Sequence, residues 1–172
     1  MSSQELNLNE LHLDLNNPRF DGLSNQRDAL EKIVLSQGSK LVNLAEDIVL
    51  NGMSPAHRML VMKAPTKGAG GYIVMDGNRR LSALRVLANP SVLDGMAKVG
   101  DITAQKLRKL AKDFNLSAIE PIDVFGQVLE LNINFARALV VQDRMAMEER
   151  ATAGVLAGDA DGVAFFEYAG IG

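Results

Sequence analysis

The chain has 172 residues, of which 47% are hydrophobic and 23% charged, so it is long enough to bury the core of one globular domain. The absence of cysteine excludes disulfides, thiolate metal sites and a cysteine nucleophile, and two isolated histidines argue against a histidine-built metal site. A net charge of -3 argues against a protein that coats nucleic acid by bulk electrostatics, although it allows a local basic patch. Because the sequence has neither a membrane-length apolar run nor a signal-peptide pattern, we expect no membrane partner and a cytoplasmic location.

The first third of the chain predicts one strand followed by two helices. Leucine alternates with polar residues over 5–15, which is typical of a half-buried strand. The strand ends at NNPRF, where Pro18 keeps the preceding residue out of the helical region and sends Arg19 onto an extended or turning backbone. Apolar residues at helical spacing then predict amphipathic helices over 24–37 and 39–52, the second ending at Gly52.

The rest of the chain predicts a hairpin, two helices and a further strand. The hairpin is expected from strands at 57–64 and 72–76 around a glycine-rich reversal, followed by helices over 77–90 and 101–114, a strand over 121–131 and a helix from about 134 to 157. These elements predict an α/β (α+β) fold, a small mixed sheet surrounded by helices. We expect residues 1–130 to form the domain and 131–172 a helical C-terminal extension, which is either part of that domain or the start of a longer protein.

The stretch YIVMDGNRRLSAL places Arg79 and Arg80 in the first turn of a helix, where acidic residues are favoured. Free N–H groups and the helix dipole attract an anion there, and one guanidinium group can donate two parallel hydrogen bonds to two oxygens of a phosphate. The alternative is that Asp76 or Asn78 caps the helix while both arginines reach solvent or acidic neighbours. Consecutive helical residues point about 100° apart, so we expect the two arginines to have different roles.

Three segments in order, NNPRF, EDIVLNGMSPAHRMLV and YIVMDGNRRLSAL, resemble the N-terminal domain of ParB and the wider ParB/sulfiredoxin superfamily. The resemblance covers roughly residues 8 to 88. It implies a ParB/sulfiredoxin-like fold and a pocket for a nucleoside triphosphate, which is CTP in the partition proteins and ATP in sulfiredoxin. The pocket would be formed by the turn at Gly52 and Pro55 and by the helix start at Gly77, Asn78, Arg79 and Arg80, with the arginines on the phosphates.

The sequence also departs from the family. Sulfiredoxin chemistry depends on a cysteine that this chain lacks, which excludes that activity. The partition proteins carry a glutamate at the position of Asn78 and continue into a helix-turn-helix DNA reader, whereas ITAQKLRKLAKDFNLS is followed here by the strand-like PIDVF. The asparagine variant of this motif, with Asp76 leading it, is more similar to stand-alone ParB-like domains of phage, mobile-element and defence proteins.

Several further residues are candidates for the pocket. Arg19 points into it or forms a surface ion pair with Asp14, and His57 acts as a base, contacts a nucleobase or is simply polar surface. Asp76 is the candidate catalytic residue and the candidate ligand for a Mg²⁺ ion that accompanies a triphosphate. The sequence identifies no convincing general base, so binding is expected rather than turnover.

Two functions from different classes remain open at the sequence level. The first is a nucleotide-dependent switch or weak NTPase that binds CTP or ATP in a DNA-related process. The alternative is a DNA-binding or nuclease module of a phage, mobile-element or defence system, with a backbone phosphate in the same pocket. A third reading is an interaction domain with a degenerate pocket, and both a homodimer and a protein partner stay open.

Overall fold

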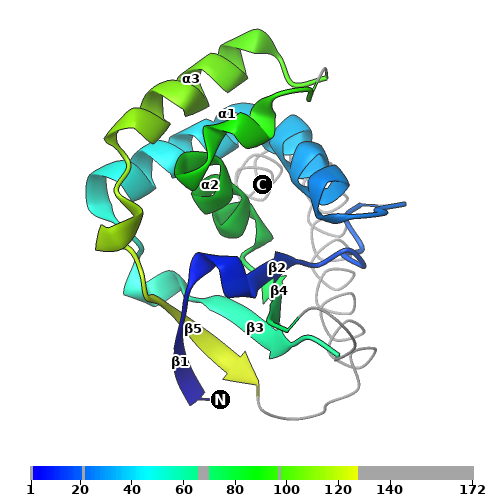
Figure 1. Cartoon of the computed structure of the whole chain (residues 1–172), viewed down its shortest axis with the longest axis vertical. Helices are drawn as coiled ribbons and strands as arrows, with labels where there is room; N and C mark the ends of the chain where they lie inside the picture. Colours follow the sequence, from blue (N-terminus) through cyan, green and yellow to red (C-terminus); the bar gives the residue numbers. More distant parts are fainter. Residues whose placement is uncertain (1, 21, 66–69, 97, 128–172) are drawn as a thin grey trace, which may run out of the picture. The chain divides into compact units, whose positions relative to one another are not determined.

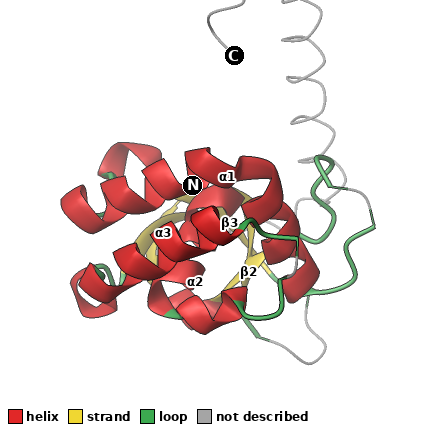
Figure 2. Cartoon of the chain, turned by 90° about the horizontal axis from the view of Figure 1, so that it is seen from above, coloured by secondary structure: helices red, strands yellow, loops and turns green. Residues whose placement is uncertain are grey.

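The computed structural model describes residues 2–20, 22–65, 70–96 and 98–127, which all belong to the unit Met1–Val128. They form a mixed α/β fold, as the sequence predicts, with helices packed over a curled sheet (Figures 1 and 2). The predicted extension 131–172, and with it the helix expected from about 134 to 157, lies outside the described residues.

The described strands form one sheet in the order β1-β5-β3-β4-β2, with the bounds β1 Ser2–Leu6, β2 Leu11–Leu13, β3 Met59–Lys63, β4 Tyr72–Asp76 and β5 Ile122–Gln127. The pairs β1–β5 and β3–β4 are antiparallel, whereas β3–β5 and β2–β4 are parallel. The antiparallel pairing of β3 with β4 confirms the predicted hairpin.

The prediction of a single strand over 5–15 is wrong, because this part of the chain contributes to two strands, β1 and β2, at opposite edges of the sheet. Between β1 and β2 the chain makes the 3-10 helix η1, Leu8–Glu10, in which the side chain of Glu10 accepts a hydrogen bond from the N–H of Asn7 at 2.9 Å. The alternation of leucines persists through this turn, which is why the sequence pattern does not reveal it. Since so short a segment joins both edges, the sheet has to curl.

The helices α1 Gln26–Asn51, α2 Asn78–Ala88 and α3 Asp101–Asp113 pack against one another. The two helices predicted over 24–37 and 39–52 are present as the two halves of α1, separated by a kink at Gly38 with φ 45° and ψ -117°. Helix α2 is central, since it contacts α1, α3, β2 and β4 and buries Leu81, Leu84 and Leu87.

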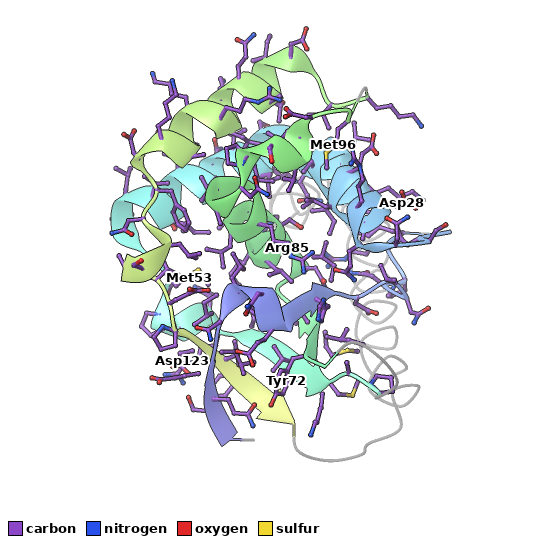
Figure 3. All side chains as sticks on the ribbon, viewed as in Figure 1. Asp28, Met53, Tyr72, Arg85, Met96 and Asp123 are labelled. Atoms are coloured by element: carbon purple, nitrogen blue, oxygen red, sulfur yellow. The ribbon has the colours of Figure 1, made fainter. Side chains whose placement is uncertain are left out.

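The open edge of β2 is covered by two polar side chains. The side-chain amide of Gln26 accepts from the N–H of Leu13 and donates to its carbonyl, both at 2.8 Å. Arg85, labelled in Figure 3, donates from Nη2 to the carbonyl of Leu11 at 2.6 Å and from Nη1 to Gln26 at 3.2 Å. Burial lowers the pKa of Arg85 from its ordinary value, because desolvation penalises the charged form. These bonds satisfy backbone groups that an edge strand otherwise exposes.

Among the helices that the structure describes, none combines the length and apolar character needed to cross a membrane.

Replacing Gly38 with alanine tests the kink in α1. No atom lies within 4 Å of the position that a Cβ at Gly38 would take, so the cost is conformational, and we expect a loss of about 1–3 kcal/mol in the free energy of unfolding. Gly70→Ala is the matched control, because its Cβ also meets open space but its φ is not in the left-handed range. Urea unfolding measures both, and equal midpoints for the two variants would contradict a strained kink.

Candidate functional site

Strand β4 ends at Asp76 and α2 begins at Asn78, with Gly77 between them at φ 100° and ψ 15°. Among the described residues no side chain caps this end of α2, and the first intrahelical bond runs from the N–H of Leu81 to the carbonyl of Gly77 at 3.0 Å. The N–H groups of the three preceding residues have no acceptor within the helix. The alternative in which Asp76 or Asn78 caps the helix is therefore wrong, and the helix start presents donors to an anion.

Gly77 lies in close contact with two side chains. A Cβ at this position would lie 2.7 Å from Cγ of Met59 and 3.3 Å from Nη1 of Arg80. The positive φ and the close approach both favour glycine here. Gly77 therefore lets the strand-to-helix turn pass next to the guanidinium group of Arg80.

Asn78 fixes the start of α2 from the inside. Its side chain is 7% exposed, accepts from the N–H of Asp14 at 3.0 Å and donates to the carbonyl of Val74 at 2.8 Å. Ser82, one turn later, donates from its hydroxyl to the carbonyl of Asn78 at 2.8 Å. Asn78 was predicted to bind phosphate, but its side chain joins β4, α2 and the segment after β2, so its backbone N–H is the group that faces a ligand at the helix start.

Arg79 and Arg80 have different surroundings, in agreement with the expectation from helical geometry. Arg79 is exposed and donates from Nη1 to Oε1 of Gln37 at 3.3 Å, next to the kink of α1. Arg80 is half-buried, and its Nη1 is shielded from solvent without any hydrogen-bond partner in the described part of the chain. A buried guanidinium nitrogen without a partner is costly, so an acceptor at this atom would be favourable.

Asp14, the residue after β2, is 4% exposed and connects the start of α2 to the NNPRF segment. Oδ1 of Asp14 accepts from the N–H of Asn16 at 3.0 Å, and Oδ1 of Asn17 accepts from the N–H of Arg19 at 3.0 Å. The side chain of Arg19 is exposed and forms no ion pair with the described residues.

The Gly52 turn lies at the same end of the sheet, because Leu60 near the start of β3 pairs with Asp76 at the end of β4. Gly52 ends α1 with φ 74°, and its N–H donates to the carbonyl of Ile48 at 2.9 Å. A Cβ on Gly52 would lie 3.8 Å from Cδ1 of Ile119, so this glycine faces the segment before β5 rather than Gly77.

Two other residues of this turn are open to solvent. Pro55 and His57 belong to the exposed 3-10 helix η2, Pro55–His57, and Nδ1 of His57 lies 3.3 Å from Oγ of Ser54. The neighbouring Arg58 already has partners, since its Nε lies 2.6 Å from Oδ2 of Asp123 and its guanidinium lies over the ring of Phe125.

Asp76 is exposed at the end of β4 and is the carboxylate nearest in sequence to the helix start. Within the described ranges, no group of three or more histidine or acidic side chains is arranged to hold a metal ion. One carboxylate suffices only where a ligand supplies the other oxygens, as triphosphates do for Mg²⁺.

Sequence reasoning missed the buried roles of Asn78 and Asp14 and the contact of Met59 with Gly77. Asn78 stands beside Arg79 at a strand-to-helix turn, and nothing in this sequence pattern indicates that the side chain of Asn78 turns toward the core. The register of β2 and β4, which are far apart in the sequence, decides which backbone groups Asn78 meets.

Comparisons of the chain with protein-family models, with curated proteins and with solved structures found no match.

The variant Asn78→Ala tests the clamp on α2. It leaves the N–H of Asp14 and the carbonyl of Val74 without these partners, so we expect a loss of about 1–3 kcal/mol in the free energy of unfolding. Asn43→Ala, an exposed change within α1, is the control and should lie within about 0.5 kcal/mol of the parent. Chemical denaturation compares them, and a neutral Asn78→Ala would show that the clamp does not stabilise the fold.

Proposed function

We propose that the chain is a ParB-like nucleotide-binding domain that binds CTP or ATP at the start of α2 and acts as a nucleotide-dependent switch or weak NTPase in a DNA-related process. The observation that carries this proposal is the buried Nη1 of Arg80, which has no partner among the described residues and lies beside a helix N-terminus that none of them caps. A phosphate oxygen supplies the acceptor that Nη1 lacks, and the same phosphate accepts from the N–H groups of the first turn.

The surrounding residues complete a triphosphate site in this proposal. Arg79 leaves its long bond to Gln37 and binds a second phosphate, and Arg19 reaches from the NNPRF segment. Asp76 holds a Mg²⁺ ion that is otherwise bound by phosphate oxygens and water. Gly77 lets the phosphate approach the backbone, and the exposed Pro55 and His57 form a wall for the nucleoside on the Gly52 side.

A route for switching follows from the bond between Arg79 and Gln37. Gln37 immediately precedes Gly38, where α1 changes direction. When phosphate draws Arg79 away, α1 loses a side-chain contact next to its kink. A ligand shifts such an equilibrium by its different affinity for the two arrangements, so tight nucleotide binding would change the angle of α1 and the surface it presents.

Binding is better supported than hydrolysis. Phosphoryl transfer to water needs a positioned nucleophile in addition to stabilised phosphate charge. Asp76 and His57 are both exposed, and the side-chain contact that the described residues make with them is the 3.3 Å approach of Oγ of Ser54 to Nδ1 of His57. We therefore propose slow hydrolysis at most, with Asp76 as the candidate catalytic residue.

Calorimetric titration of the full chain with CTP, ATP, GTP and UTP, each with and without Mg²⁺, tests the site. We expect micromolar binding of CTP or ATP, weakened about 10- to 100-fold in Arg80→Ala, because one charge-assisted contact to phosphate is worth about 1.5–3 kcal/mol. Arg79→Ala should weaken binding less, because this side chain is exposed and gives up its bond to Gln37.

The double variant Lys40→Ala/Lys63→Ala is the charge-matched control for Arg79→Ala/Arg80→Ala, because both lysines are exposed and lie outside the helix start. A folded Arg79→Ala/Arg80→Ala variant that binds every nucleotide like the parent would refute the site. A parallel titration with duplex DNA tests the alternative DNA-binding or nuclease function. This alternative is favoured if only the duplex binds and its affinity falls steeply with salt.

A further inference from the structure

Helix α3 has one buried face and one basic face. Ala104 and Leu107 are buried, and Leu110 packs against the same core. The opposite face carries the exposed side chains of Lys106, Lys109 and Lys112. We call the surface formed by Lys109, Lys112, Arg108 and Pro90 the α3 face.

The lysines of the α3 face are not used by the fold. Arg108 forms an ion pair with Asp94 at 2.7 Å, but Lys109 and Lys112 have no hydrogen bond or ion pair in the described ranges. The whole chain has a net charge of -3. A concentration of unpaired positive charge on an acidic protein indicates local electrostatic complementarity to a partner rather than general solubility.

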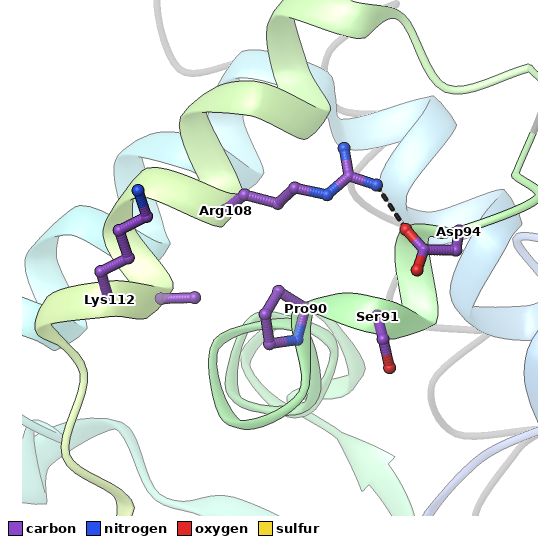
Figure 4. A pocket seen from close by; sticks show the side chains of 6 residues that line it. Pro90, Ser91, Asp94, Arg108 and Lys112 are labelled. Carbon is purple, nitrogen blue, oxygen red and sulfur yellow. Dashed lines mark hydrogen bonds and ion pairs between the residues drawn. The ribbon is translucent and has the colours of Figure 1, made fainter.

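Next to these lysines lies a shallow cavity of about 360 Å³, lined by Pro90, Ser91, Asp94, Arg108, Ala111 and Lys112 (Figure 4). Pro90 and Ala111 supply apolar surface, and the Arg108–Asp94 ion pair spans one side. The cavity is at the C-terminal end of α2, so it is not part of the site at Arg79 and Arg80.

We propose that the α3 face is a docking surface for an acidic segment of a partner protein, in which glutamate or aspartate residues pair with Lys109 and Lys112 and an apolar side chain enters the Pro90–Ala111 cavity. Nucleic acid is a poorer fit. It needs cations but has no use for an apolar cavity, and the α3 face offers no aromatic side chain for stacking on bases. An amphipathic acidic peptide uses every component of the α3 face.

The test uses the full chain and two fluorescent synthetic peptides of equal length, one of glutamate with interspersed leucine and one of glutamate alone. Fluorescence anisotropy should show saturable binding of the leucine-containing peptide and weaker binding of the all-glutamate peptide. In Lys109→Glu/Lys112→Glu we expect affinity for the first peptide to fall at least about tenfold, because two attractive contacts become repulsive. Lys40→Glu/Lys63→Glu, which makes the same change in net charge elsewhere, should bind within about twofold of the parent.

Circular dichroism on heating checks that each variant is folded, and Lys109→Gln/Lys112→Gln replaces the reversal variant if that one unfolds. The proposal is overturned if neither peptide binds below about millimolar concentration, if both reversal variants lose equal affinity, or if a duplex DNA binds through Lys109 and Lys112 while the peptides do not. Binding of the peptide should be unchanged in Arg79→Ala/Arg80→Ala. A failure of the docking proposal can therefore be distinguished from a failure of the proposed nucleotide site.

Discussion

The buried side chain of Asn78 is the contact on which the proposed site depends. It bonds to the backbone of Val74 in β4 and of Asp14 after β2, and so holds together the helix start, the strand end and the residue that follows β2. A polar group at this depth is tolerated because both of its ends are paired. With Asn78 turned inward, Arg79 is exposed and Arg80 half-buried at the helix start, and the N–H groups of that turn have no acceptor within the helix.

The sheet order explains why this helix start is at the surface although α2 is central. Because β2 and β4 run parallel and β3 runs against β4, the ends of β2 and β4 and the beginning of β3 meet at one end of the sheet. At the side of the sheet, Gln26 and Arg85 occupy the backbone groups of β2, so that edge is closed to another strand. The proposed site uses the strand ends, while the C-terminal end of α2 and the α3 face form a second surface with a different chemistry.

Local patterns predicted the helices, the hairpin and the divergence of Arg79 from Arg80, because spacing along a helix fixes the side of each residue. They could not predict the turn at Leu8–Glu10, since leucine alternation continues through it, nor the inward orientation of Asn78, which depends on pairing between distant strands. The two halves of α1 were visible in the sequence as separate amphipathic runs, and Gly38 shows how they join. The Gly52 turn was expected to form a pocket together with the helix start, and the neighbour that a Cβ at Gly52 would meet, Ile119, is equally invisible in local patterns.

The most direct measurement of the nucleotide site is an NMR titration of the ¹⁵N-labelled chain with CTP and with ATP in the presence of Mg²⁺. The account predicts that the backbone N–H resonances of Asn78, Arg79 and Arg80 shift together and saturate, and that the guanidinium resonance of Arg80 shifts with them as Nη1 gains an acceptor. If both nucleotides leave these resonances unmoved, or shift resonances of α3 alone, the start of α2 is not a phosphate site.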